Sequence, residues 1–415
     1  MATTRPALTI EGLLDELKTL AAISEADPPV VTRVVFSEAD LRARAYVKGL
    51  CADAGLEVTE DAIGNTFARW QGLEPELAPI GTGSHIDAIP NAGLYDGCVG
   101  VLGGLEAIRV LQKLEFKPRR SIELVIFTAE EPTRFGIGCL GSRMMANVLT
   151  PTQARKLTDK EGRSLEQLRT QAGFVGGLES VALPAERFHR FIELHIEQGP
   201  LLEQEGIDLG LVTHIAAPAS VRILIEGEGG HAGGKLMPGR KDALTAAAEL
   251  ILALESAAKS TSAIDTVATV GVCEVFPGAV NSIPSRVRLE TDIRDIDGAR
   301  RDRVLETLQA ACNDVATRRR VAISTELVNV DPPATCDPAI LAALEQSAQT
   351  ACKSYKRMVS RAYHDSLFMA RIAPVAMLFI PCRGGVSHRP DEYASPEWIG
   401  SGVHVLSRTL ATLAG

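Results

Sequence analysis

The chain has 415 residues, of which 46% are hydrophobic and 23% are charged, an ordinary composition for a globular protein of two or three domains. Its net charge of -9 argues against a nucleic-acid partner, because proteins that bind phosphate backbones present a basic face. No apolar run approaches the roughly 20 residues of a bilayer-spanning helix, so we expect no membrane partner.

The N-terminal segment and the cysteines bear on the cellular compartment. The first residues mix acidic and apolar side chains at helical spacing and lack the basic-then-apolar order of a secretory signal. The eight cysteines are scattered, with no Cys-x-x-Cys pair. In a chain of this length, such cysteines are expected to be reduced thiols of a cytoplasmic protein.

The first half of the chain alternates helical and strand-like patterns. A turn signal at Gly64-Asn65 lies within a period-two alternation, and the apolar run SIELVIF is typical of a strand buried on both faces. The patterns predict helices at 9–23, 37–54 and 97–114 and strands at 79–87, 121–127 and 188–199. Strands that alternate with helices indicate a mostly parallel α/β sheet.

The pattern changes near Thr213. From there strands and helices at 241–258 and 299–318 follow in the order β-α-β-β-α-β, which predicts a ferredoxin-like α+β module. The proline-rich segment NVDPPATCDP ends the module, and a helix, a strand and a last helix follow it. We therefore expect an α/β domain of residues 1–212 and 331–415, interrupted by an inserted domain at 213–330.

Polar clusters follow several of the predicted strands, at the sheet edge where active sites of α/β proteins gather. GTGSHIDAIPNAGLYDG places His85 and Asp96 on one segment. Alone, His85 suits a hydrogen-bonded loop histidine and Asp96-Gly97 a turn. Together they offer the nitrogen and oxygen ligands of zinc or manganese.

Two adjacent glutamates, Glu130 and Glu131, come directly after the buried strand SIELVIF. Adjacent side chains on an extended segment point in opposite directions, so one could ligate a metal while the other faces a substrate. A solvated loop pair is the commoner interpretation of a Glu-Glu dipeptide, but its place at a buried strand end weakens that interpretation.

Two further histidines complete an ordered set. His195 alternates with apolar neighbours in ELHIEQGPLLE, which also suits a core histidine, and His388 lies in the Gly-rich loop GGVSHRPDEY, which also suits a surface loop. Taken in order with Asp96 and the glutamates, these residues could hold two divalent metals about 3.5–4 Å apart, with Asp96 as the bridge.

These motifs resemble the hydantoinase/carbamoylase family of dinuclear metal amidohydrolases. The resemblance covers nearly the whole chain and rests on GSHIDAIPNAGLYDG, EEPTRFG, ELHIEQGPLLE, GHAGG, GAVNSIP and GGVSHRPDE. Within the family, SRAYHDSLFMARIAP and FIPCRGGVSHRPDEY are most similar to the ureidoglycolate amidohydrolase branch. Other branches tend to have a Gly-rich stretch where this chain has Arg361 and Tyr363.

The resemblance implies a role for each candidate residue. One metal would be held by His85, Asp96 and His195, and the other by Asp96, Glu131 and His388, with Glu130 as the general base. The implied substrate contacts are Gln198, His231, Asn281, Arg294 and His364, to which we add Arg361 and Tyr363. Manganese is the metal the resemblance favours, and zinc, cobalt or nickel would also suit these ligands.

The chemistry of the residues agrees with these roles. A dimetal site would activate water and polarise an amide carbonyl, while Glu130 would move the proton. His231 is a candidate partner for the oxyanion, reached by domain closure or from a second subunit, and in the family the inserted domain forms a homodimer. The planar fork of Arg294 suits a substrate carboxylate, although a salt bridge to Asp292 would suit it equally.

Several functions share this site pattern. An N-carbamoyl-L-amino acid hydrolase, a β-ureidopropionase or an allantoate amidohydrolase would use the same metal ligands with a differently shaped pocket. A peptidase or aminoacylase is disfavoured because Gln198 suits a ureido NH2 group. A binding protein that has lost catalysis is disfavoured because no ligand and no candidate base is missing. The sequence thus predicts a metal-dependent amidohydrolase for a small ureido carboxylate.

Overall fold

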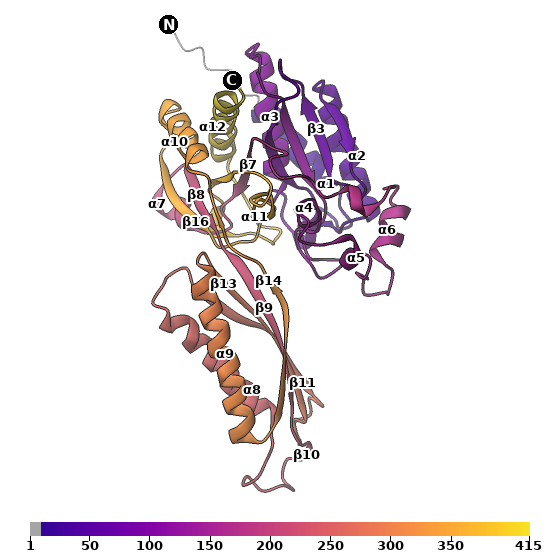
Figure 1. Cartoon of the computed structure of the whole chain (residues 1–415), viewed down its shortest axis with the longest axis vertical. Helices are drawn as coiled ribbons and strands as arrows, with labels where there is room; N and C mark the ends of the chain where they lie inside the picture. Colours follow the sequence, from indigo (N-terminus) through magenta and orange to yellow (C-terminus); the bar gives the residue numbers. More distant parts are fainter. Residues whose placement is uncertain (1–9) are drawn as a thin grey trace. The chain divides into compact units, whose positions relative to one another are not determined.

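The computed structural model describes residues 10–415, and the chain divides into two compact units (Figure 1). The first unit contains the residues up to Thr213 together with 335–360 and 364–415. The second unit contains 214–334 and also 361–363. The second unit is therefore inserted in the sequence of the first, and three residues of the C-terminal segment belong to it.

A mixed sheet forms the centre of the first unit and has nine strands within residues 10–415. Its central strands β17, β7, β4 and β6 are parallel, whereas β8 on one side and β3 and β2 on the other are antiparallel to their neighbours. The order is β15 (Ala334–Thr335), β8 (Leu209–Ile215), β17 (Val375–Ile380), β7 (Arg190–Ile196), β4 (Ile80–His85), β6 (Ile122–Phe127), β3 (Thr66–Trp70) and β2 (Glu57–Glu60), with β16 (Tyr355–Ser360) beside β8. The expected mostly parallel sheet is thus confirmed at its centre.

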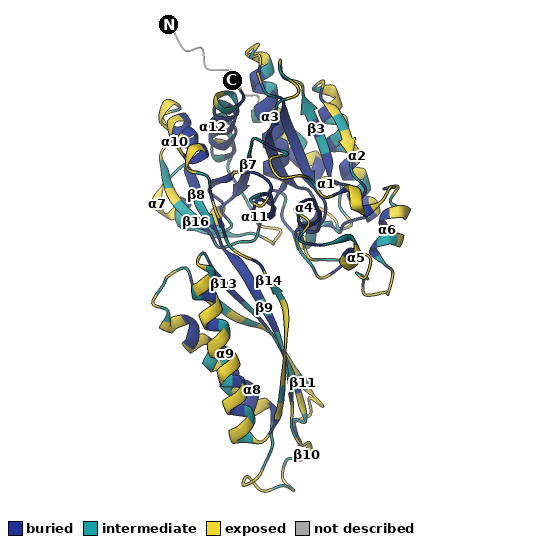
Figure 2. Ribbon diagram, in the orientation of Figure 1, coloured by how far each residue is buried: buried dark blue, intermediate teal, exposed yellow. Residues whose placement is uncertain are grey.

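Helices cover both faces of this sheet, so β4, β6 and β17 are buried along their whole length (Figure 2). Successive side chains of a strand point to opposite faces. Leu194 of β7 contacts Gly103 of α3 (Cys98–Lys113) and Gly402 of α12 (Pro396–Ala414), while the neighbouring Glu193 accepts a hydrogen bond from Ser366 of α11 (Ser366–Met369). The helices α3 and α12 therefore cover one face, and α11 covers the other.

The close approach of α3 to the sheet depends on small residues. A Cβ atom added at Gly100 would lie 2.3 Å from the backbone oxygen of Leu194, which no real side chain tolerates. The Gly-rich start of this helix in the sequence thus has a packing function. It places the N-terminus of α3, and Asp96 just before it, at the carboxyl end of the parallel strands.

The second unit has the ferredoxin-like arrangement expected from the sequence. In its described residues, a four-stranded antiparallel sheet has the order β11 (Val267–Phe276), β13 (Arg286–Asp295), β9 (Ala217–Glu226) and β14 (Ala322–Val330). Helices α8 (Ala243–Ser260) and α9 (Gly298–Arg319) bury their apolar sides against it. The edge strands β11 and β14 are largely exposed, as their colour in Figure 2 shows.

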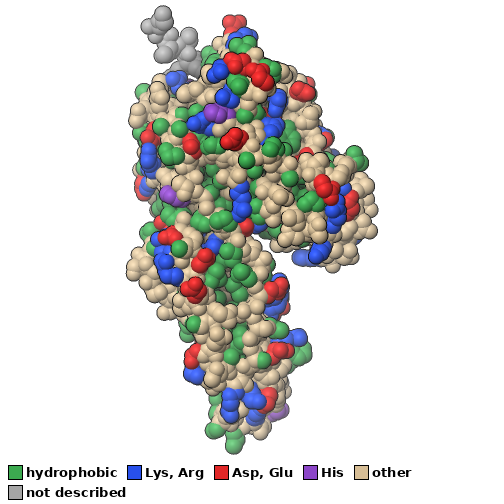
Figure 3. All heavy atoms as spheres, in the orientation of Figure 1, with side chains coloured by type: hydrophobic (Ala, Val, Ile, Leu, Met, Phe, Trp, Pro, Cys, Tyr) green, Lys and Arg blue, Asp and Glu red, His purple; other side chains and the backbone are tan. Residues whose placement is uncertain are grey.

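The remaining elements connect or extend these layers. They are α1 (Ile10–Ala22), β1 (Val31–Arg33), α2 (Glu38–Asp53), β5 (Ala88–Ala92), α4 (Leu140–Met145), α5 (Pro151–Ala154), α6 (Leu165–Gln171), η1 (Leu178–Ser180), α7 (Leu201–Glu205), β10 (Gly230–His231), β12 (Ser282–Ile283), α10 (Pro338–Thr350) and η2 (Arg383–Gly385). Among residues 10–415, no helix has the length and apolar character that crossing a membrane requires. On the face drawn in Figure 3, acidic and basic side chains are interspersed.

Candidate metal centre

Polar side chains from four parallel strands meet at the carboxyl end of the central sheet. His85 is the last residue of β4, and His195 is the second-last residue of β7. Glu130 and Glu131 follow β6, and His388 lies beyond η2 in the loop after β17. Because parallel strands end at the same edge of a sheet, residues far apart in the sequence are brought together there.

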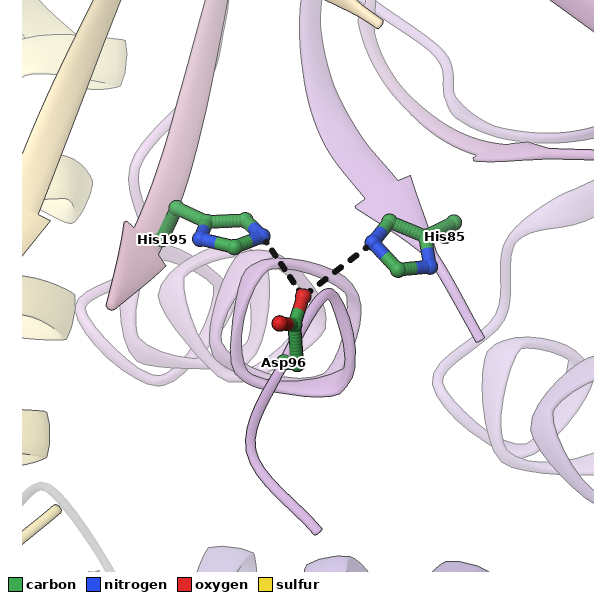
Figure 4. A group of neighbouring side chains, drawn as sticks. All are labelled: His85, Asp96 and His195. Atoms are coloured by element: carbon green, nitrogen blue, oxygen red, sulfur yellow. Dashed lines mark ion pairs between the residues drawn. The ribbon is translucent and has the colours of Figure 1, made fainter. Parts of the chain in front are cut away.

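Asp96 lies between two groups of possible metal ligands. Its Oδ1 atom is 3.5 Å from His85 Nε2 and 3.3 Å from His195 Nε2 (Figure 4). Its Oδ2 atom is 3.3 Å from His388 Nε2, which in turn is 3.1 Å from Glu131 Oε1. Within each group the ligand atoms lie within 4.8 Å of one another. One carboxylate is therefore shared by two candidate groups of metal ligands.

The orientation of the two buried histidines fits a metal. His85 Nδ1 is 3.0 Å from the backbone oxygen of Asp87, and His195 Nδ1 is 2.9 Å from that of Ile196. In the neutral ring, Nδ1 then donates to the carbonyl, and Nε2 presents a lone pair to Asp96. Lone pairs that face a carboxylate need a cation between them, so this donor set fits a divalent metal.

The buried carboxylates around these ligand groups also favour the binding of cations. Burial raises the pKa of Glu130 well above its ordinary value, and the nearby Glu131, Asp365 and Asp96 raise it further, against the opposing effect of His85. Burial would raise the pKa of Asp96 as well, but without cations the protonated rings of His195, His388 and His85 hydrogen-bond to it and hold its pKa well below its usual range. A cluster with this excess of buried carboxylates is stabilised by bound cations.

Glu130 belongs to neither ligand group. Its Oε2 atom is 3.8 Å from His85 Nε2, and its Oε1 atom lies 3.5 Å from the thiol of Cys139. Its neighbour Glu131 faces His388 instead. The two adjacent glutamates thus have different partners, and Glu130 is buried beside the first ligand group with its carboxylate available for proton transfer.

Asp87 holds this pair in place, and sequence reasoning missed it. Its Oδ1 atom accepts the N–H of Glu130 at 3.2 Å, and its Oδ2 atom accepts the N–H of Glu131 at 3.1 Å. Burial raises its pKa to about 6. The His-x-Asp spacing at the end of a strand, His85 to Asp87, was a signal that could have found it.

Two candidate substrate contacts lie in the first unit. Gln198 donates from Nε2 to Asp96 Oδ2 at 2.6 Å, and within residues 10–415 its buried Oε1 atom has no hydrogen-bond partner. His364 packs against His195 with ring centroids 4.7 Å apart, and its Nε2 atom is 3.0 Å from Ser360 Oγ. The structure therefore brings both residues to the metal centre.

His364, His195 and Glu193 form a third possible ligand group, but its carboxylate is already engaged. Glu193 accepts hydrogen bonds from Ser84 Oγ at 2.7 Å and from Ser366 Oγ at 2.6 Å. These bonds tie β4, β7 and α11 together below the site. Glu193 is therefore a structural residue.

The other candidates lie in the second unit and are described within that unit alone. His231 is exposed, and its Nδ1 atom accepts the N–H groups of Gly233 and Gly234 at 3.2 and 3.1 Å. Asn281 is exposed next to β12, and its backbone oxygen accepts the N–H of Ala232. The glycine-rich loop thus fixes the ring of His231 while leaving Nε2 free of these two bonds.

The three remaining candidates of the second unit, two arginines and a tyrosine, are each bonded to a nearby acidic residue. Arg294 forms the salt bridge to Asp292 that the sequence offered as its alternative role, at 2.8 Å, and donates to the backbone oxygen of Arg361. Arg361 pairs with Asp265 at 2.5 Å. Tyr363 donates its hydroxyl to Asp331 Oδ2 at 2.7 Å.

Comparison with known proteins agrees with the site. Residues 81–412 match the model of peptidase family M20/M25/M40. A ureidoglycolate hydrolase from Arabidopsis thaliana is 52% identical over 410 residues, which cover 97% of this chain and 86% of that protein. An N-carbamoyl-L-amino acid amidohydrolase from Geobacillus stearothermophilus is 36% identical over 409 residues, covering 97% and 98% of the two chains. A crystal structure of AtUAH in complex with glyoxylate has a TM-score of 0.90 and 51% identity, over 98% of both chains.

These relatives confirm the resemblance to carbamoylase-type amidohydrolases that the motifs indicated, and with it a hydrolase that acts on C–N bonds. The solved structure confirms the fold over nearly the whole chain. The ligand set at the strand ends, the two-unit architecture and the family match all agree. The chain belongs to peptidase family M20/M25/M40.

Proposed function

We propose that this protein is a divalent-metal-dependent amidohydrolase that cleaves the ureido C–N bond of (S)-ureidoglycolate. The observation that carries the proposal is Asp96, which is shared between two ligand groups beside the unligated Glu130. Two further facts support the substrate: the 52% identity to a ureidoglycolate hydrolase and the glyoxylate in the complex of a structural relative.

His85, Asp96 and His195 would hold one cation, and Asp96, Glu131 and His388 the other. Bound there, two divalent cations would lower the pKa of water and polarise the ureido carbonyl. Manganese is our choice among the metals that these nitrogen and oxygen ligands suit, which include zinc, cobalt and nickel. The scattered cysteines support a cytoplasmic location for the enzyme.

Glu130 would move the proton. One of its carboxylate oxygens accepts the proton of the attacking water, and the same oxygen then delivers it to the leaving nitrogen. Burial and the adjacent carboxylates raise the pKa of Glu130, and nearby cations would lower it, so the group can accept the proton in one step and release it in the next. The carbamate that this cleavage releases decomposes to carbon dioxide and ammonia, and loss of ammonia from hydroxyglycine gives glyoxylate.

We propose substrate contacts in each unit. The unpartnered Oε1 atom of Gln198 suits an N–H of the ureido group, and His364 lies beside the same ligands. Asn281 and Arg294 remain the candidates for the carboxylate, and Arg361 and Tyr363 those for specificity. Because Arg294 and Arg361 are paired with acids, a substrate carboxylate would have to compete with Asp292 or Asp265.

His231 would donate to the oxyanion. Its Nδ1 atom accepts two backbone N–H groups, so the proton of the neutral ring is on Nε2, where a hydrogen-bond donor is needed. We further propose that the inserted unit forms a homodimer and that His231 serves the site of the partner subunit. The exposed edge strands of this unit support such pairing.

An N-carbamoyl-L-amino acid hydrolase is the second candidate, which the 36% identity to such an enzyme favours. It would use the same ligands and the same base and differ only in the pocket. The carbamoyl group of both substrates presents the same C–N bond to the metals, so the metal centre does not distinguish them.

The test is ammonia release by the manganese-loaded protein. We would compare (S)-ureidoglycolate with allantoate, N-carbamoyl-β-alanine and a set of N-carbamoyl-L-amino acids. Selective turnover of ureidoglycolate is expected. Preferred turnover of carbamoyl amino acids would keep the mechanism and reject the substrate, and no turnover of any of them would reject both.

A further inference from the structure

We propose that Glu392 and Ser387 are positioning residues that hold Asp96 in place for the second cation, the one assigned to Glu131 and His388. We call this pair the Asp96 clasp. The inference rests on the proposed dinuclear function and adds to it two residues that are not ligands. Both lie in the GGVSHRPDE segment, which the metal centre so far uses only through His388.

Glu392 holds the backbone of the segment that carries Asp96. It is 4% exposed, and its Oε1 atom accepts the N–H of Tyr95 at 2.7 Å and the N–H of Asp96 at 3.0 Å. These donors lie almost three hundred residues earlier in the chain, so the bonds join two distant loops. A buried carboxylate with this many backbone donors fixes the position of both peptides.

Ser387 holds the side chain of Asp96. Its Oγ atom is 2.5 Å from Asp96 Oδ2 and 3.2 Å from Glu392 Oε2, and it directly precedes His388. Ser387 thus donates, together with Gln198, to the oxygen that faces the second ligand group, and the residue next to Ser387 supplies a ligand of that group. Hydrogen bonds of this kind to a ligating carboxylate set its direction and its affinity for metal.

Glu392 packs closely against the segment that carries Asp96, and this packing depends on a glycine. Gly93 lies against its side chain, and a Cβ atom added at Gly93 would be 2.4 Å from Glu392 Cβ and 2.7 Å from Oε1. Only glycine permits this contact. Gly93 therefore offers a second way to disturb the clasp without touching either of its side chains.

The clasp supports the two metal sites unequally. His85 and His195 stand on the ends of buried strands, and each is oriented by a backbone carbonyl. His388 has no such strand: its side chain is 45% exposed, and its backbone adopts a positive φ of 60°. The second group thus depends on the C-terminal loop, which the clasp ties to Asp96.

The experiment measures Mn²⁺ binding by the full chain after removal of metal, using isothermal titration calorimetry without substrate. The unsubstituted protein is expected to bind two Mn²⁺. Glu392→Ala, Ser387→Ala and Gly93→Ala are each expected to weaken one binding event by about 10- to 100-fold and to leave the other unchanged. If Glu392→Ala fails to fold, the other two variants still test the proposal.

Two further variants separate the clasp from general effects. Glu203→Ala removes another carboxylate that accepts a backbone N–H of the same loop, from Gly384 at 2.5 Å, and is expected to keep both events. Glu392→Gln keeps an acceptor for the N–H groups of Tyr95 and Asp96, and its amide can donate to Ser387 Oγ, so it is expected to restore the weakened event.

Three outcomes would overturn the proposal. The first is that the three variants bind two Mn²⁺ with unchanged affinity. The second is that folded variants lose both events equally, because the clasp would then not serve one site. The third is that the unsubstituted protein binds fewer than two Mn²⁺, which would remove the dinuclear function itself and so is distinguishable from failure of the clasp alone.

Discussion

Two adjacent glutamates after β6 serve different partners because Asp87 holds both of their backbone N–H groups. With the backbone fixed, the side chain of Glu131 turns to His388 and that of Glu130 turns to His85 and Cys139. In the proposed mechanism, the division between a ligand and a base would thus be set by a third carboxylate, that of Asp87. This arrangement lets the two roles be tested by equivalent substitutions at neighbouring positions.

We predict different defects for Glu130→Gln and Glu131→Gln. Glu130→Gln should bind two Mn²⁺ and lower kcat by about 10²- to 10⁴-fold, because only the proton acceptor is removed. Glu131→Gln should lose the second Mn²⁺, because a neutral amide is a weaker ligand. Metal content after gel filtration and steady-state ammonia release would check both, and full activity of Glu130→Gln would reject its role as the base.

The residues that sequence reasoning found and missed differ in how they act. The candidate ligands could be named because metal ligands have restricted chemistry and these residues lie in polar segments near predicted strands: His85, Asp96, Glu131, His195 and His388. The residues missed were Asp87, Ser387 and Glu392. They act through backbone N–H groups or another side chain. Asp87 had one local signal, the His-x-Asp spacing, but the bonds of Ser387 and Glu392 between distant loops leave no local pattern in one sequence.

At the scale of elements, the contact between α3 and β7 sets the position of Asp96. Glycines on the sheet-facing side of the helix allow its backbone to approach the strand. Because Asp96 lies two residues before the first residue of α3, any outward shift of the helix would move the shared carboxylate relative to His195. The packing of one helix and the geometry of the metal centre are therefore linked.

We predict that Gly100→Ala destabilises the protein by about 1–3 kcal/mol, because its Cβ would lie 2.3 Å from Leu194 O. Gly49→Ala is the matched control: it is also inside a helix, α2, and nothing lies within 4 Å of its added Cβ. That change should stabilise the protein by about 0.5–1 kcal/mol. Urea unfolding would measure both, and equal effects would contradict the packing argument.

The elements themselves could largely be predicted from the sequence. The helix expected at 97–114 is Cys98–Lys113, and the run SIELVIF contains β6, because buried strands and amphipathic helices have strong local patterns. The antiparallel strands at the sheet edges could not be predicted, since strand direction depends on pairing. For the same reason, nothing local showed that residues 361–363 join the second unit, through the bonds of Arg361 and Tyr363.

At the scale of the whole molecule, the chain leaves the first unit after Thr213 and returns at Thr335. The exposed His231 lies in the N-terminal part of the inserted unit's sequence. It is in a loop where the N–H groups of two neighbouring glycines bond to its ring. If dimers form through this unit, as proposed, a site in one subunit would be completed by the loop of the other. Mixed dimers can test this directly.

We predict that His231→Ala and Glu130→Gln proteins are each nearly inactive and that a mixed dimer of the two recovers activity. In the mixed dimer, one site has an intact Glu130 and receives an intact His231 from the other subunit. The two chains would be co-expressed with different tags, and the doubly tagged dimer would be assayed. A mixed dimer of Glu130→Gln with Glu131→Gln should stay inactive. If the dimer of His231→Ala with Glu130→Gln recovers no activity, the proposal that His231 serves the site of the partner subunit is rejected.

The position of β17 has a consequence for the order in which the protein is made. This strand lies between β7 and β8 in the central sheet, although it follows them by more than 150 residues in the sequence. While the ribosome is still making the inserted unit, the first unit therefore has a gap in its sheet and lacks His388. The pairing of β17 with β7 and β8 joins residues far apart in the sequence, so we expect it to be a slow step in folding. If His388 holds the second cation as proposed, both sites can be loaded only after the segment that carries His388 has been made, and a nascent chain without it would not hold both cations.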